Sequence, residues 1–202
     1  MAYHQPFQII GFHSCDREVG LKVLNGQLEL KDSDNEWDWL GSGVYFWEEN
    51  PYRALQYANE CSEGNQKNKI RIKIPFVIGA IIELGNCLNL LEPKSLNIVK
   101  QAHDSLEAVY KESGTKLPRN EGPKRKLDCA VMRYVHATRS KLDYEPFDTV
   151  RSSFEEGEKL YPGSTFTNRV HIEICVLNPQ SIKGYFLPRP IKEFNPYLKG
   201  HR

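Results

Sequence analysis

The sequence lacks any stretch of about 18 consecutive apolar residues, the length that a membrane-spanning helix needs. Residues 1–6 show no charged segment followed by an apolar run, so we expect no secretion signal, no membrane association and a cytoplasmic protein. A net charge of +1 gives no overall attraction to nucleic acid or membrane. The sequence also lacks a Gly-rich phosphate loop, which argues against a kinase, an NTPase or a dehydrogenase.

The cysteines are few and scattered. Their odd number, five, comes without a Cys-x-x-Cys pair and without histidines at zinc-ligand spacing, so we expect reduced thiols and no metal. With 40% hydrophobic content, 202 residues can bury one good core. We therefore expect a single domain over residues 1–202, with its core at about 7–187 and a polar tail at 188–202.

Hydrophobic periodicity predicts both strands and helices. The strands are expected at residues 7–12, 44–47, 69–74, 76–82, 169–177 and 181–186. The helices are expected at residues 16–24, 51–61, 95–114 and 127–139. Residues 155–164 are rich in charges and turn formers, which predicts a long loop of the kind that is usually functional or mobile.

Residues 35–58 hold all three tryptophans and the clearest local signals. Gly41 and Gly43 allow unusual backbone angles or the close approach of a ligand, and a short buried strand follows. Asn50-Pro51 is a helix start, because Asn caps the free amides and Pro fits the first helical position. Tyr45 is therefore well placed to stack on a flat ring. The alternative is an aromatic residue packed in the core at a tight turn.

A second segment, upstream, ends an apolar strand with His13 just before a helix. Together the two segments resemble ADP-ribosyltransferases of the diphtheria-toxin and poly(ADP-ribose) polymerase type. That family has a strand ending in His-Gly-Ser/Thr, a Gly-x-Gly-Ile-Tyr-Phe strand and a helix with a further Tyr. The counterparts here are His13-Ser14-Cys15, Gly41-Ser42-Gly43-Val44-Tyr45-Phe46 and Tyr57, and Ser14 stands where the family has a glycine. The resemblance covers residues 7–187.

The resemblance implies an α+β fold with a mainly antiparallel split β-sheet flanked by helices. It implies NAD+ as substrate, with no metal. His13 would hold the adenosine-side ribose, Tyr45 would stack on nicotinamide, and a glutamate would bond the nicotinamide ribose. The residues implied in NAD+ binding are His13, Ser14, Cys15, Gly43, Tyr45 and Tyr57. Without the resemblance, His13 and Tyr45 could each be a satisfied core residue.

The third catalytic position falls between His171 and Glu173, and a shift of one residue would turn the side chain to the other face. Glu173 is the best acidic candidate, with His171 as its neighbour. The alternative is an exposed strand edge with charged side chains. Glu155 and Glu156 in the preceding segment are further candidates.

Basic residues are concentrated at 116–126, where Lys124, Arg125 and Lys126 would contact phosphates of a target or lie in a solvated loop. Arg151 would bind a pyrophosphate or target phosphate, or pair with Asp148 on the surface. The expected function is mono-ADP-ribosylation of an intracellular macromolecule, with RNA favoured over protein. A toxin or phage-defence effector with a cognate antitoxin or inhibitor fits this expectation. An NAD+ glycohydrolase and a non-catalytic binding module of the same fold are the alternatives.

Overall fold

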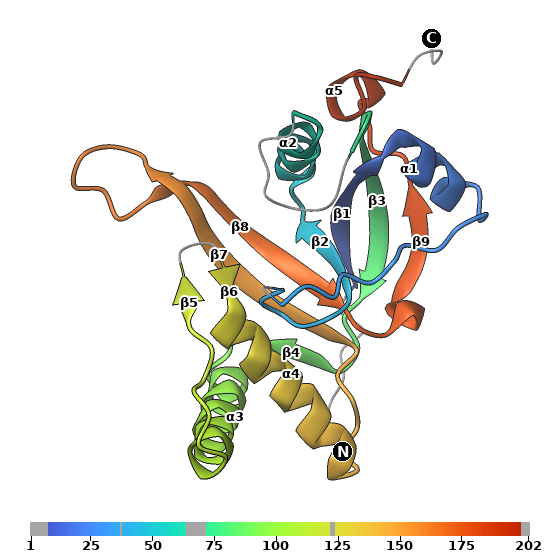
Figure 1. Ribbon diagram of the computed structural model, residues 1–202. Helices are drawn as coiled ribbons and strands as arrows, with labels where there is room; N and C mark the ends of the chain where they lie inside the picture. Colours follow the sequence, from blue (N-terminus) through green and yellow to red (C-terminus); the bar gives the residue numbers. More distant parts are fainter. Residues whose placement is uncertain (1–7, 37, 64–71, 122–123, 199–202) are drawn as a thin grey trace.

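The computed structural model of the chain describes residues 8–36, 38–63, 72–121 and 124–198. A seven-stranded sheet in the order β4-β7-β8-β2-β1-β3-β9 carries helices on both faces, and a separate two-stranded hairpin lies beside it (Figure 1). The strands are β1 (Gln8–Asp16), β2 (Val44–Glu48), β3 (Pro75–Glu83), β4 (Cys87–Asn89), β5 (Asn120–Glu121), β6 (Lys124–Arg125), β7 (Thr149–Lys159), β8 (Thr167–Val176) and β9 (Ile182–Phe186). The helices are α1 (Arg17–Leu24), α2 (Pro51–Ser62), α3 (Pro93–Glu112), α4 (Lys126–Lys141) and α5 (Ile191–Phe194), with the 3₁₀ turn η1 at Pro179–Ser181.

The α+β class is confirmed, and the seven-stranded sheet is mixed. Its only parallel neighbours are β4 and β7, and the other five neighbouring pairs among the described residues run antiparallel. The register between β1 and β2 consists of two pairs, Gly11↔Glu48 and Phe12↔Trp47. By contrast, β1 pairs with β3 along its whole length, from Gln8 to Asp16. The contact between β1 and β2 is therefore much the shorter of the two.

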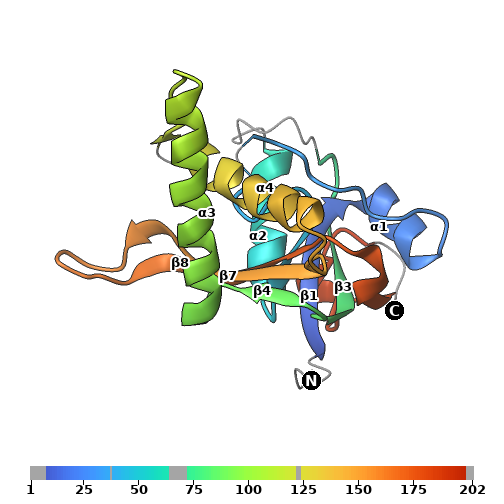
Figure 2. The same cartoon turned by 90° about the horizontal axis from the view of Figure 1, so that it is seen from below.

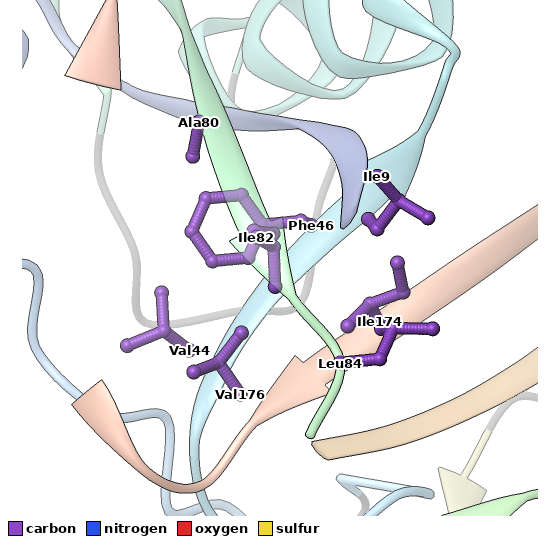
Figure 3. Packing of buried hydrophobic residues seen from close by; sticks show 8 residues of the cluster. All are labelled: Ile9, Val44, Phe46, Ala80, Ile82, Leu84, Ile174 and Val176. Carbon is purple, nitrogen blue, oxygen red and sulfur yellow. The ribbon is translucent and has the colours of Figure 1, made fainter. Parts of the chain in front are cut away.

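The centre of the core lies where β1, β2, β3 and β8 meet. Figure 3 shows eight buried side chains gathered there. The cluster consists of Ile9, Val44, Phe46, Ala80, Ile82, Leu84, Ile174 and Val176. The expected strand at 76–82 is confirmed as part of β3, whose apolar run is buried along nearly its full length.

The face of the sheet opposite this central cluster is covered by two groups of helices, each over a different part. Helix α2 packs near β1, β2 and β3, where Ala54 joins a cluster with Phe12 and Trp47. Helices α3 and α4 lie at the opposite end, beside β4 and β7 (Figures 1 and 2), and Met132 packs there against Val150. The strands in between, β2 and β8, are therefore flanked by helices on either side.

Two expectations need correction, one about the helix at 95–114 and one about the tail at 188–202. The apolar spacing of the helix at 95–114 predicts an inward-facing stripe of Ile98, Val99, Ala102, Leu106, Val109 and Tyr110. The prediction is wrong at Ile98 and Val109, which are 37% and 48% exposed. Helix α3 packs along α4, so fewer of its apolar residues reach the core. The tail at 188–202 was expected to lie outside the core, but Asn195 is buried and bonds both the N–H and the C=O of Val77, at 2.8 and 3.0 Å. The side chain of Asn195 thus serves as a hydrogen-bonding partner for the backbone of β3. Residues 199–202 lie outside the described part.

The loop predicted at 155–164 is strand in its first half, at 155–159, and is irregular at 160–164. Strand β7 continues to Lys159 and β8 begins at Thr167, so the two form a long hairpin that projects from the body of the protein (Figure 1). Cross-strand pairing, such as Glu155↔Val170, satisfies the backbone of residues that look loop-like in isolation. Glycine at 157, with φ of 81°, accommodates a register shift in this hairpin.

The strand predicted at 69–74 is not formed by its described residues. Residues 69–71 lie outside the described part, and 72–74 are irregular. The N–H groups of Lys73 and Ile74 donate to the carboxylate of Asp16, at 2.8 and 3.1 Å. The same carboxylate caps α1 through the N–H of Glu18, so a side chain takes the place of a partner strand.

Candidate functional site

His13 lies on β1 beside the short contact with β2. Its Nδ1 is 2.8 Å from the carbonyl oxygen of Tyr45, and its ring lies 5.6 Å from that of Phe46. Burial lowers the pKa of the imidazole below its ordinary value of 6.5, against the opposing effect of this hydrogen bond. Since a carbonyl can only accept, the neutral ring carries its proton on Nδ1. Nε2 is therefore left as a hydrogen-bond acceptor in a fixed tautomer.

Ser14 and Cys15 use their side chains within the fold. The Ser14 hydroxyl donates to the carbonyl of Ala54 and so ties β1 to α2. Burial raises the pKa of the Cys15 thiol to about 12, and the residue packs in a cluster with Phe76 and Val23. Only the backbone groups of Ser14 and Cys15 can therefore contribute to a binding site. All five cysteines of the chain are free.

Tyr45 is held firmly at the mouth of β2. Its hydroxyl donates to the carbonyl of Gly41 at 2.7 Å and accepts from the N–H of Leu40 at 3.1 Å. The ring is partly buried against the core cluster beneath α4, and burial raises the pKa of the phenol. Tyr45 thus fixes the segment that precedes β2. The same segment needs glycine at position 43, because a Cβ there would lie 2.5 Å from the carbonyl oxygen of Val176 on β8.

Glu173 faces the region between the two helical groups. In the register it is opposite Trp47 of β2 and Ser152 of β7, and its side chain is 21% exposed. Its Oε1 lies 3.1 Å from Nε2 of His171, whose Nδ1 lies 3.1 Å from the carbonyl of Arg169. The His171 side chain is 1% exposed, so both ring nitrogens are confined to these partners.

The contact with His171 positions the carboxyl group of Glu173. It engages one oxygen of that group, and the other oxygen remains for a ligand.

Arg53 was not singled out from the sequence. It is 8% exposed, and its guanidinium carbon lies 5.6 Å from the ring centroid of Trp47 and 5.8 Å from that of Tyr57. Its guanidinium pairs with Glu156 at 3.3 Å and with Glu60 at 3.7 Å. Glu60 also pairs with Arg169 at 2.9 Å, so two cations and two carboxylates balance in this cluster. The spacing of residues 53, 57 and 60 along one face of a helix is the signal that could have found this cluster. Tyr57 and Glu156 therefore belong to the buried contact between α2 and the β7–β8 hairpin.

The predicted basic residues divide between three settings. Arg151 makes two bonds to Glu48, at 2.5 and 2.7 Å, and adjoins neither His13 nor Glu173 in the register. Lys126 pairs with Glu36 at 2.7 Å. Lys124 is exposed, in the small β5–β6 hairpin. Arg125 lies with its guanidinium carbon 4.3 Å above the ring centroid of Trp39.

A cavity of about 550 Å³ lies between α3, α4 and β7. Its lining includes Trp39, Arg125, Met132, Ser152 and Phe154. The cavity contains neither His13 nor Tyr45, but Ser152 is the direct cross-strand partner of Glu173. His103, whose side chain is 37% exposed, also lines it. Sequence reasoning missed this cavity because it depends on how α3 packs along α4.

The comparisons with known proteins give one relative. The chain is 26% identical to "Uncharacterized protein MJ0359" of Methanocaldococcus jannaschii over 211 residues, which cover 93% of this chain and 92% of that protein. No family model matches the sequence. No solved structure matches it either. Within the described residues, no helix is long and apolar enough to cross a membrane, and no group of three or more His, Cys, Asp and Glu is arranged to hold a metal ion.

Proposed function

We propose that this chain is a mono-ADP-ribosyltransferase that cleaves NAD+ and transfers ADP-ribose to an intracellular macromolecule. The observation that carries the proposal is that β1, β2 and β8, which bear His13, Tyr45 and Glu173, are consecutive in the sheet. Beyond Phe12, β1 makes no further pair with β2 among the described residues. This separation supports the split sheet of an ADP-ribosyltransferase-like fold.

The reaction requires the bond between ribose C1′ and the nicotinamide nitrogen to break. The electron pair goes to the nitrogen, whose positive charge is thereby neutralised, and C1′ forms a bond to an acceptor atom that loses a proton. The protein must hold the ribose and stabilise positive charge that develops at C1′. In this proposal Nε2 of neutral His13 accepts a hydrogen bond from a ribose hydroxyl, and the Glu173 carboxyl group faces the nicotinamide ribose.

The neighbours of these two residues support their proposed roles. His171 holds one oxygen of Glu173 in place, which leaves the second oxygen to receive the proton that the acceptor loses. The hydroxyl bonds of Tyr45 fix its ring, which would make it a rigid wall against nicotinamide. Tyr57 lies 5.1 Å from Trp47, centroid to centroid, and adds an aromatic surface on the α2 side.

RNA is the favoured acceptor because Arg125 lines the cavity that adjoins Glu173, and the exposed Lys124 precedes it in β6. A phosphate backbone would bind such cations with strong salt dependence. A toxin or phage-defence effector, restrained by a cognate antitoxin or inhibitor, is the biological setting that we propose for this activity. No membrane enters the proposal.

The test is to incubate the protein with NAD+ labelled in the adenylate phosphate, together with total cellular RNA and total cellular protein. We expect label on RNA, with nicotinamide released in equal amount. Label on protein alone would reject RNA as the acceptor. Release of nicotinamide without any macromolecular label would identify an NAD+ glycohydrolase, and the absence of release would reject the proposed chemistry.

A non-catalytic NAD+-binding module is a second candidate. It is favoured by Ser14 and Tyr45, whose hydroxyls are both engaged in bonds within the fold. Calorimetry with NAD+ at millimolar concentration separates the two candidates. Heat of binding without nicotinamide release would support the module, whereas binding with release would support the transferase.

A further inference from the structure

The cavity between α3, α4 and β7 has the size and the walls of a small-molecule site. Its volume of about 550 Å³ is within the range typical of ligand pockets. The lining combines apolar side chains, among them Leu90, Val131 and Met132, with a few polar ones. Ligand pockets commonly show this composition, in which apolar walls provide affinity and sparse polar groups fix the orientation.

Flat groups dominate one wall of the cavity. The rings of Trp39 and Phe154 meet edge to face with centroids 4.3 Å apart, and the guanidinium of Arg125 covers Trp39 at 4.3 Å. Unstacked nucleobases bind by stacking on aromatic side chains and on Arg guanidinium planes. This wall therefore suits a flat heteroaromatic ring better than an aliphatic chain.

Charges of both signs surround the cavity. Lys100 and Arg125 are cationic, while Asp128 and Glu155 are anionic. Arg125 pairs with Asp128 at 3.4 Å. Carboxylates accept hydrogen bonds from the exocyclic amino groups of bases, and cations bind the phosphates that flank a base. An isolated inorganic anion would find no excess of positive charge here, so the balance favours a base with its phosphate.

The cavity also has a fixed relation to Glu173. Ser152 lines the cavity and is opposite Glu173 in the β7–β8 register. Directly opposed residues in an antiparallel pair have Cβ atoms about 4.5–5.5 Å apart. A base in the cavity would thus lie next to the carboxyl group that the proposed mechanism uses.

We propose that this cavity binds one nucleobase of a single-stranded RNA and presents that nucleotide to the site at Glu173 as the acceptor of ADP-ribose. Its role as acceptor site rests on the proposed function. Binding of the base does not, because it requires no NAD+.

The test is calorimetric titration of the protein with AMP, GMP, CMP and UMP in turn, with ribose 5-phosphate as the ligand that lacks a base. We expect at least one nucleotide to bind and ribose 5-phosphate not to bind. Arg125→Leu keeps an apolar group over Trp39 and removes the cation, and should weaken nucleotide binding by about 10-fold. Arg189→Leu, the matched control, removes an exposed cation outside the cavity and outside the basic stretch at 116–126, and should leave binding unchanged.

A second variant protects the test against misfolding of the first. Val99→Trp fills the cavity from α3, at a partly buried position, and should abolish nucleotide binding while the circular dichroism spectrum stays the same. The inference is overturned if no nucleotide binds, if ribose 5-phosphate binds equally well, or if Arg125→Leu binds as tightly as the parent. Binding of N-acetyltyrosinamide in preference to all four nucleotides would also overturn it, in favour of a protein acceptor. If nucleotides bind but nicotinamide is never released, the proposed function fails and this inference of base binding stands.

Discussion

Replacing Tyr45 with phenylalanine tests whether this residue acts through its hydroxyl bonds. The change removes one oxygen and leaves the N–H of Leu40, a buried residue, without its partner. The carbonyl of buried Gly41 keeps only the weak contact from the Cys175 thiol, at 3.7 Å. A buried polar group that loses its partner costs about 1–3 kcal/mol, so we expect the free energy of unfolding to fall by this amount. For a chain of this size, each kcal/mol corresponds to about 2–4 °C, which gives a fall in Tm of about 2–12 °C.

The assay is thermal unfolding by circular dichroism, with Tyr161→Phe as control. Tyr161 is 58% exposed and makes no side-chain hydrogen bond among those found in the described residues, so its variant should melt with the parent. Tyr45→Ala should cost more, about 3–5 kcal/mol, because the ring is also lost from the core. If Tyr45→Phe melts at the parental temperature, the hydroxyl bonds do not hold the segment before β2, and the ring is free to serve as a mobile stacking group.

Three further substitutions test separate parts of the structure. Arg151→Met should lower the free energy of unfolding by about 3 kcal/mol in urea denaturation, because it leaves the carboxylate of Glu48, 12% exposed, without its partner. The double variant Arg151→Met with Glu48→Leu should recover most of this loss. If the single and double variants lose the same stability, the two residues are not coupled. Because the pKa of His13 is lowered in the folded protein, the unfolded state binds more protons at acidic pH. The free energy of unfolding should therefore be full above about pH 6.5 and fall below it. His13→Gln should flatten this fall, and the same slope between about pH 7.5 and 5 in both proteins would show that His13 does not cause it. Gly43→Ala should lower the free energy of unfolding by about 1–3 kcal/mol, because its Cβ would lie 2.5 Å from the β8 backbone. Gly184→Ala should cause no such loss, since no atom lies within 4 Å of the added Cβ. Similar unfolding midpoints for the two variants would show that the space at Gly43 is not limiting.

Local sequence signals predicted the centre of the fold well. The helix start at Asn50-Pro51 is confirmed, since the Asn50 side chain accepts from the N–H of Arg53 at 2.9 Å and Pro51 is the first helical residue. The apolar run in β3 is confirmed as a buried central strand. Both signals depend on nearest neighbours and burial, which the sequence records directly.

The parts that could not be predicted depend on contacts between distant residues. The pairs of Arg151 with Glu48 and of Arg53 with Glu156 each join residues 103 positions apart. Nothing near Arg151 distinguishes a buried ion pair from a phosphate contact. The position of Arg125 over Trp39 likewise requires the packing of α4 against the segment before β2. Pairing across the β7–β8 hairpin also makes strand of residues 155–159, the first half of a charged, turn-rich segment.

Release of free nicotinamide tests whether the residues on β1, β2 and β8 cleave NAD+. The parent protein should release nicotinamide continuously from NAD+. Glu173→Gln should reduce the rate by about 10²–10³ with little change in Tm, as expected when one preorganised electrostatic group is lost. Glu158→Gln, an exposed carboxyl change on the same hairpin, should retain the parental rate. Absence of release by the folded parent would show that the protein does not cleave NAD+, and equal rates for the parent and Glu173→Gln would show that Glu173 takes no part in the reaction.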